Sequence, residues 1–192
     1  MLQTILLSLA FIFSSGDEDK VSYSISVDES SVEWTGRKVT GEHNGTVKLK
    51  SGNLEFTKGV LTGGSFSVDM QTIDNSDLSG EWKDKLVGHL KSDDFFGVEK
   101  YPTANFVITK VVPQGPGKYK VIGNMTIKED TNPIQFIVNT VEENGKIYST
   151  ADITLDRSKY NVRYGSGSFF DDLGDKTIYD EFDLKVNIVS AK

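Results

Sequence analysis

The chain has 192 residues, of which 37% are hydrophobic, a length and composition that suit one globular domain with a sizeable core. Its 28 acidic residues outnumber its 21 lysines and arginines, giving a net charge of −7, and no basic cluster suited to a phosphate backbone occurs, so nucleic acid is not expected as a partner. Cysteine is absent, which excludes disulfides, thiolate metal sites and a cysteine nucleophile.

The N-terminal segment MLQTILLSLAFIFSSG, residues 1–16, is predicted to be a cleaved signal peptide. Its uncharged apolar run, residues 5–13, is too short to cross a bilayer, which takes about 20 apolar residues. The missing Lys or Arg ahead of the run and the missing A-x-A site count against export, and a buried N-terminal element is the alternative. We expect residues 17–192 to form the mature domain, periplasmic or secreted, without a permanent membrane anchor.

After this segment, apolar and polar residues alternate along most of the chain. In VSYSISV, residues 21–27, every second residue is apolar, a period of two that predicts a half-buried strand. Further strands are expected at SVEWTGRK, GTVKLK, NLEFTK, GVLTGGSFSVDM, TANFVITKVV, GKYKVIGNMTIK, IQFIVNTV, KIYSTADITLD and DEFDLKVNIV. Turn signals are found at Asn44-Gly45, Ser51-Gly52-Asn53, Gly115-Pro116-Gly117 and Asn144-Gly145. The pattern predicts an all-β, antiparallel protein.

One segment breaks the alternation. In SGEWKDKLVGHL, residues 79–90, Trp82, Leu86 and Leu90 recur at i, i+4 and i+8, which predicts one short helix with a single apolar stripe. About eight or more strands whose edges all need protection favour a closed barrel, with a sandwich as the alternative. A barrel of that size is filled by its own side chains or holds one small ligand, and composition alone does not decide between them.

Three stretches carry a family resemblance: HLKSDDFFGVEKYPTANFVITKV, YKVIGNMTIKEDTNPIQFIV and ITLDRSKYNVRYGSGSFFDDLGDKTIYDEFDLKVNIV. They resemble, in order and over nearly the whole chain after residue 16, the YceI-like family of periplasmic polyisoprenoid-binding proteins. The L-x-S-x-D-F-F-x-V-x-x-Y-P signature is the most specific part. The resemblance implies a lipocalin-like antiparallel β-barrel, exported by bacteria, that encloses a long isoprenoid or similar amphiphilic lipid.

The signature contains groups that could do chemistry. His89 with Asp93 or Asp94 suits acid/base catalysis or metal binding. The simpler interpretation is a histidine satisfied by a neighbouring strand, beside acids that cap a turn or face solvent. The other histidine, His43, has no i+2 or i+4 histidine partner, so no metal site is predicted.

The same stretch contains two adjacent aromatic residues, Phe95 and Phe96. Both cannot be buried in one face of a strand. We therefore expect one to face the barrel interior and the other to plug the wall beneath the helix, so that helix and loop together gate the interior.

Two arginines lie in the glycine-rich segment DRSKYNVRYGSGSFFDDLGDK, residues 156–176. Its GSGS sequence lacks the G-K-[ST] ending of a phosphate-binding P-loop. Arg157 and Arg163 are candidate contacts for a polar head group through bidentate hydrogen bonds. The alternative is a cross-strand ion pair with Asp156, Asp171 or Asp172.

The predicted function is non-enzymatic binding, transport or storage of a long hydrophobic or amphiphilic lipid: a polyisoprenoid, an isoprenoid quinone, or a fatty acid or amide. Each buried methylene contributes about 0.8 kcal/mol, so a long chain binds without a catalytic group. The alternatives are a hydrolase or isomerase acting on a lipid at the barrel mouth, and a secreted structural barrel with a filled core. No cofactor is predicted, and a homodimer is left open. The expected hydrophobic ligand contacts are Trp34, Phe66, Val68, Leu86, Leu90, Phe95, Phe96, Phe106, Ile108, Tyr119, Val121, Met125, Phe136, Val138, Ile153 and Leu155.

Overall fold

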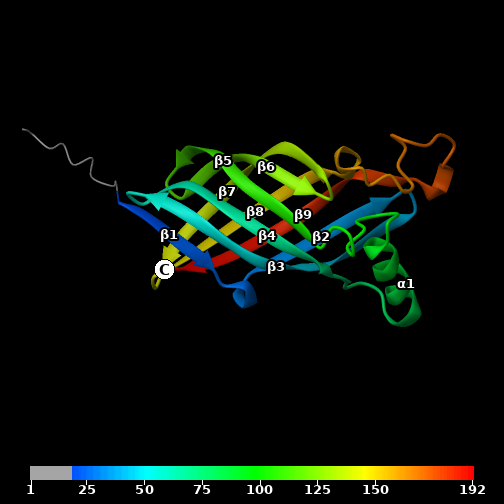
Figure 1. The fold of residues 1–192 in the computed structure, drawn as a ribbon, viewed down its shortest axis with the longest axis horizontal. Coiled ribbons are helices and arrows are strands. Elements are labelled where there is room, and N and C mark those ends of the chain that lie inside the picture. The colour runs from blue at the N-terminus through cyan, green and yellow to red at the C-terminus, as the bar shows by residue number, and fades with distance from the viewer. Residues whose placement is uncertain (1–18) are drawn as a thin grey trace, which may run out of the picture.

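The structure, a computed structural model, describes residues 19–192 (Figure 1), so the predicted signal peptide, residues 1–16, lies outside the described residues. The described part contains one α-helix, α1 (Gly80–Lys91), and three 3₁₀-helices, η1 (Val27–Glu29), η2 (Arg157–Tyr160) and η3 (Gly174–Lys176). Its strands are β1 (Lys20–Ile25), β2 (Ser31–Lys38), β3 (Gly41–Thr57), β4 (Val60–Asn75), β5 (Thr103–Gly115), β6 (Lys118–Ile127), β7 (Asp130–Glu143), β8 (Lys146–Asp156) and β9 (Ile178–Ala191).

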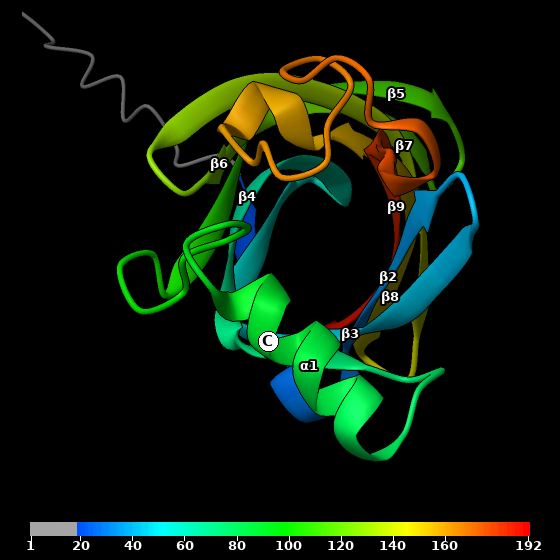
Figure 2. The same cartoon turned by 90° about the vertical axis from the view of Figure 1, so that its right-hand side faces the viewer.

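The strands form one antiparallel sheet that closes on itself. Neighbours follow the order β3, β2, β9, β8, β7, β6, β5, β4, and β4 pairs back with β3. Strands β1 and β2 share one place between β3 and β9, because Tyr23 lies opposite Leu54 whereas Trp34 lies opposite Gly45, further along the same strand. The result is a closed barrel with eight strand positions, seen along its axis in Figure 2, and the predicted antiparallel barrel is confirmed.

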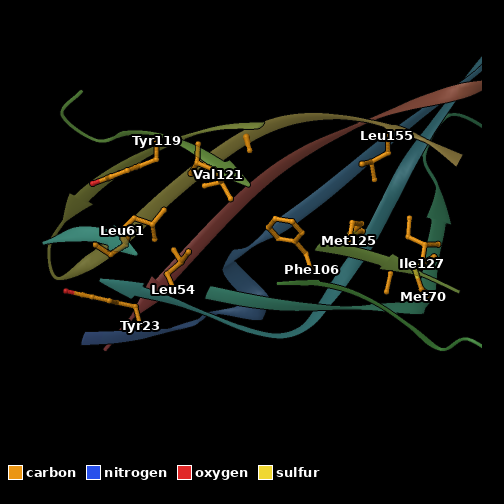
Figure 3. Packing of buried hydrophobic residues seen from close by; sticks show 14 of the residues in the cluster. Tyr23, Leu54, Leu61, Met70, Phe106, Tyr119, Val121, Met125, Ile127 and Leu155 are labelled. Atoms are coloured by element: carbon orange, nitrogen blue, oxygen red, sulfur yellow. The ribbon is translucent and has the colours of Figure 1, made fainter. Parts of the chain in front are cut away.

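The period-two pattern separates the inside of the barrel from the outside. In β6, for example, Tyr119, Val121 and Met125 are buried, whereas Lys118 and Asn124 between or beside them are exposed. Figure 3 shows buried side chains from several strands converging on the barrel interior. We call the end with the β3–β4, β5–β6 and β7–β8 hairpins the deep end. The opposite end, which carries α1, the β2–β3 hairpin and the loop of residues 161–177, is the mouth (Figure 1).

Two predicted turns are wrong, because Asn44-Gly45 and Ser51-Gly52-Asn53 both lie inside the single long strand β3. Each glycine marks a close approach between strands. A Cβ atom on Gly45 would lie 2.7 Å from the indole of Trp34, and one on Gly52 would lie 2.8 Å from the ring of Phe66. Just before Gly52, between Leu49 and Ser51, the pairing of β3 with β4 shifts at a bulge.

The other two predicted turns are confirmed. Residues 116–117, directly after Gly115 at the end of β5, connect β5 to β6, and Asn144-Gly145 connects β7 to β8. Asn144 and Gly145 both have positive φ, 51° and 77°, as a tight two-residue hairpin requires.

The predicted helix is confirmed, but its apolar stripe is not uniformly buried. Leu90 is buried and Leu86 half-buried, whereas Trp82 is 71% exposed. Burial rises toward the C-terminal end of α1, because that end joins the barrel and the first turn projects from it (Figure 2). Within residues 19–192, no helix is long and apolar enough to cross a membrane.

Candidate functional site

Two apolar cavities adjoin inside the barrel. The deep cavity has a volume of about 110 Å³ and the mouth cavity about 120 Å³. Aliphatic and aromatic side chains from alternate positions of the strands form nearly all of both walls. The two cavities share the side chains of Val32, Val68, Met125, Leu155 and Leu184, so they follow one another along the barrel axis.

The structure brings most of the predicted ligand contacts to these cavities. Among those expected from the sequence, the deep cavity is lined by Phe66, Val68, Phe106, Ile108, Val121, Met125, Phe136, Val138, Ile153 and Leu155. The mouth cavity is lined by Trp34, Val68, Leu90, Phe95, Phe96, Met125 and Leu155. Two predicted contacts line neither cavity. Leu86 packs behind the mouth cavity, and Tyr119 lies buried near the β5–β6 hairpin at the deep end.

Several lining residues are additional to the predicted set. They include Leu54, Leu61, Met70, Leu184, Val186 and Ile188. Counting every second residue onward from Phe182 leads to the three in β9, so period two could have found them. Leu54 and Leu61 flank the β3–β4 hairpin, where the predicted turn at residues 51–53 hid the inward direction of the strand.

Phe95 and Phe96 both line the mouth cavity, so the expected division between interior and wall is wrong. The expectation assumed a strand, but residues 92–102 form successive turns. The amides of Phe95 and Gly97 both donate to the carbonyl of Ser92, at 3.1 and 2.8 Å. In this winding backbone the two rings can point the same way, with centroids 6.1 Å apart.

An aromatic cluster at the mouth separates the mouth cavity from a surface cleft. The ring of Tyr164 lies edge-on to His89, with centroids 4.3 Å apart, and His89 in turn lies 5.1 Å from Phe95. Phe95 is buried against the cavity, whereas Tyr164 is half exposed and lines the cleft. We call the rings of His89, Phe95 and Tyr164 the aromatic partition, because they lie between the mouth cavity and the cleft.

The buried side chain of Arg157 joins the loop of residues 161–177 to β9 at the mouth. Its guanidinium donates to four backbone carbonyls, those of Tyr179 (3.1 Å), Val162 (2.8 Å), Tyr164 (2.9 Å) and Ile178 (2.9 Å). Burial lowers the pKa of this guanidinium, and Asp180, at 3.4 Å, and Asp156 oppose that shift. Four of its five N–H groups thus donate to backbone carbonyls, and the guanidinium also forms an ion pair with Asp180. The ion pair that was the alternative for Arg157 is formed with Asp180 of β9, and not with Asp156, Asp171 or Asp172.

Arg163 has a different environment. It lines the surface cleft together with Lys128, Lys176, Asp93 and Asp94, and the cleft has a volume of about 700 Å³. Its Nε donates to the side chain of Asn161 at 2.5 Å. The cleft thus combines three cations with two carboxylates next to the aromatic partition.

The groups required by the hydrolase alternative are poorly arranged for catalysis. The Nε2 atom of His89 lies 3.7 Å from Asp94, beyond hydrogen-bond distance, and the ring is held between Phe95 and Tyr164. Ser92 directs its hydroxyl to the backbone carbonyl of His89 at 2.8 Å, not to the imidazole. Across the described chain, no three His, Asp or Glu side chains are grouped to hold a metal ion.

A group of hydrogen-bonded polar side chains around Asp77, just before α1, attaches this segment to β3. Asp77 accepts hydrogen bonds from the amide of Asn44 (2.9 Å), from His43 (2.8 Å) and from Asn75 (2.6 Å). Burial raises the pKa of Asp77, but these hydrogen bonds outweigh it and lower the pKa to about 2. Lys83 of α1 adds a second tether, 2.8 Å from Asp74 of β4.

Comparison with known proteins gives a consistent result. The model of the YceI-like domain family matches residues 23–190. A UPF0312 protein of Shewanella denitrificans is 32% identical over 92 residues, which are 48% of this chain and 46% of that protein. A UPF0312 protein of Pseudomonas putida is 34% identical over 93 residues, again 46% of its length. The matched part thus spans about half the length of these curated relatives.

Two solved structures share the fold. BcnA of Burkholderia cenocepacia has a TM-score of 0.72 and 21% identity, over 86% of this chain and 98% of BcnA. A domain from Saccharophagus degradans, described as polyisoprenoid binding and implicated in plant cell wall breakdown, has a TM-score of 0.67 and 13% identity, over 88% of this chain and 97% of that domain. Both likenesses extend along nearly the whole barrel.

Proposed function

Because the chain belongs to the YceI-like domain family, we propose that it is a non-enzymatic protein that holds the apolar part of a long lipid inside its barrel. The observation that carries the proposal is the apolar lining of two adjoining cavities that share five side chains. The fold of the polyisoprenoid-binding domain of S. degradans supports an isoprenoid as the ligand of this chain as well.

The dimensions of the cavities favour a slender ligand. Volumes of about 110 and 120 Å³ are well below the roughly 300–1,000 Å³ of most small-molecule pockets. A single hydrocarbon chain fits such a space only if neighbouring side chains shift. Met125 borders both cavities, and its unbranched thioether chain changes shape at low cost.

The polar end of the lipid is proposed to lie in the surface cleft. Both cavities lack a free cation, because Arg157 gives its donors to backbone carbonyls. In the cleft, Arg163, Lys128 and Lys176 offer positive charge beyond the aromatic partition. We therefore assign the head-group contact to Arg163 and not to Arg157, with Phe95 and Tyr164 moving apart as the ligand enters.

Export to the periplasm is proposed together with this function. The apolar leader, residues 1–16, supports it. N-terminal sequencing of the chain from a periplasmic fraction should begin near residue 17, and a chain that still begins at Met1 there would contradict the proposal.

Binding of a hydrophobic fluorescent probe tests the proposed interior site. Replacing Phe96 with Asp places a charge on the wall of the mouth cavity and should weaken probe binding at least tenfold, as should Phe95→Asp. His89→Ala is the matched control from the same segment and should change the affinity little. Thermal unfolding of each variant checks that the barrel persists.

The same measurement separates the alternatives. A structural barrel with a filled core would bind no probe in the wild-type protein. A polar binding site would lose the probe in His89→Ala while both Phe variants retained it, and the carrier function would then be wrong.

A further inference from the structure

Exposed valine, isoleucine and tyrosine side chains occur along the whole barrel, but the exposed tryptophan and phenylalanine side chains all lie at the mouth. Among residues 19–192, the exposed tryptophan and phenylalanines are Trp82 (71%), Phe169 (40%) and Phe170 (50%). Trp82 lies in α1, and both phenylalanines lie in the loop of residues 161–177. Val39, which is 48% exposed, lies in the β2–β3 hairpin. All of these segments belong to the same end of the barrel.

These residues stand on separate projections around the opening. Seen along the barrel axis, α1 lies on one side of the mouth, the loop of residues 161–177 on the opposite side, and the β2–β3 hairpin between them (Figure 2). Such an arrangement does not form the continuous, well-packed core of a protein interface. A fluid lipid surface can receive several separate apolar projections at once.

Cations accompany the aromatic side chains. The ammonium of Lys85 lies 5.0 Å from the ring of Trp82, and the guanidinium of Arg163 lies 4.9 Å from the ring of Phe169. An aromatic ring beside a cation is typical of the membrane interface, where the ring sits at head-group depth and the cation meets phosphate. Charge complementarity to phospholipid is therefore built into two of the projections.

Acidic residues limit the positive charge of this end. Glu81 lies 3.6 Å from Lys85, and Asp171, Asp172 and Asp175 follow the exposed phenylalanines. The protein as a whole carries a net charge of −7. Attraction to a strongly anionic membrane is consequently weak, and the rim suits a surface rich in zwitterionic lipid.

We propose that this mouth rim, formed by Val39, Trp82, Phe169 and Phe170, docks the barrel mouth-first on a phospholipid bilayer. The inference rests on the proposed function, since a lipid carrier must collect or deliver its ligand at a membrane. Docking in this orientation places the aromatic partition against the bilayer surface. A lipid tail then passes from the bilayer into the mouth cavity without exposure to water.

Flotation with phosphatidylcholine vesicles tests the docking. The protein without residues 1–16 should float with the vesicles, and the double variant Val39→Ala/Trp82→Ala, whose two residues line neither the cavities nor the cleft, should lose at least tenfold of the vesicle-bound fraction. Val141→Ala is the matched control, because Val141 is 63% exposed but lies on β7 near the deep end. Equal flotation of the double variant and the wild type, or an equal loss in Val141→Ala, would overturn the proposal.

Tryptophan fluorescence gives an independent readout. Of the two tryptophans, Trp34 is buried and Trp82 is exposed, so brominated phosphatidylcholine should quench the wild-type emission through Trp82. Trp82→Phe should abolish most of the quenching yet still float, because it keeps an apolar anchor. Undiminished quenching in Trp82→Phe would contradict insertion of α1.

Probe binding in vesicle-free solution separates this inference from the proposed function. The double variant should bind the hydrophobic probe as the wild type does. If the wild type binds the probe but does not float, docking is wrong and the interior site stands. If it floats through the rim but binds no probe, the interior site is wrong and docking stands.

Discussion

The wall of the barrel and its mouth are held together in different ways. In the wall, strand pairing satisfies the backbone, and inward side chains such as Val121 and Leu155 pack by alternation alone. At the mouth, irregular segments are fastened by a few polar side chains, above all Arg157 and Asp77. The wall therefore sets the shape of the ligand space, whereas individual hydrogen-bonded groups set the position of the entrance.

Removing the buried guanidinium should break this arrangement most severely. Arg157→Leu leaves four backbone carbonyls without their donor, and we expect the free energy of unfolding to fall by about 3–5 kcal/mol. Urea unfolding measures the change. Arg163→Leu, six residues away on the surface, should change it by less than about 0.5 kcal/mol. Equal losses in the two variants would contradict the fastening role of Arg157.

A larger side chain on the inner face of the barrel wall should weaken ligand binding and leave the mouth intact. Val138 and Ile137 are neighbours on β7, but Val138 lines the deep cavity and Ile137 is 38% exposed on the outside. Val138→Phe should weaken binding of a long-chain hydrophobic probe about tenfold, because the larger ring occupies part of the cavity. Ile137→Phe should bind the probe as the wild type does. If both variants bind normally, the ligand does not reach the deep cavity.

The smallest effect on the free energy of unfolding is expected when low pH protonates Asp77, which attaches the segment before α1 to β3. The pKa of Asp77 in the folded protein is about 2, below its ordinary value of 3.8, so its carboxylate stabilises the fold above pH 3.8. That contribution is lost as the pH falls from about 4 to 2, and because solvent partly screens the group it amounts to roughly 1 kcal/mol. Unfolding of the wild type and Asp77→Asn, compared across this pH range, measures it. The stability difference between them should shrink as the pH falls, and a difference independent of pH would contradict the assignment.

Period two in the sequence predicted most of the wall, since one register per strand places every second residue inside. The prediction of turns was wrong at two glycines, because glycine is typical both of turns and of close contacts between strands. Gly45 and Gly52 resemble turn residues, yet they permit close packing by Trp34 and Phe66 within β3, a contact that only the assembled barrel reveals.

The mouth was less predictable because its contacts are distant in sequence. Arg157 and Arg163 look alike in the chain, but one is enclosed by carbonyls of β9 and the returning loop while the other lines the cleft. Trp82 had the spacing of a buried helix residue, and it is exposed because the first turn of α1 projects from the barrel.

Native mass spectrometry with a long-chain polyprenol tests whether the barrel holds a lipid in its interior. The protein is extracted with organic solvent, refolded, and mixed with the polyprenol without detergent. We expect the wild type to form a complex with one polyprenol per chain, and we expect this complex to be reduced in Val138→Phe and retained in Ile137→Phe. A refolded wild-type barrel that forms no such complex, or a complex that Val138→Phe leaves unchanged, would contradict a lipid held inside the barrel.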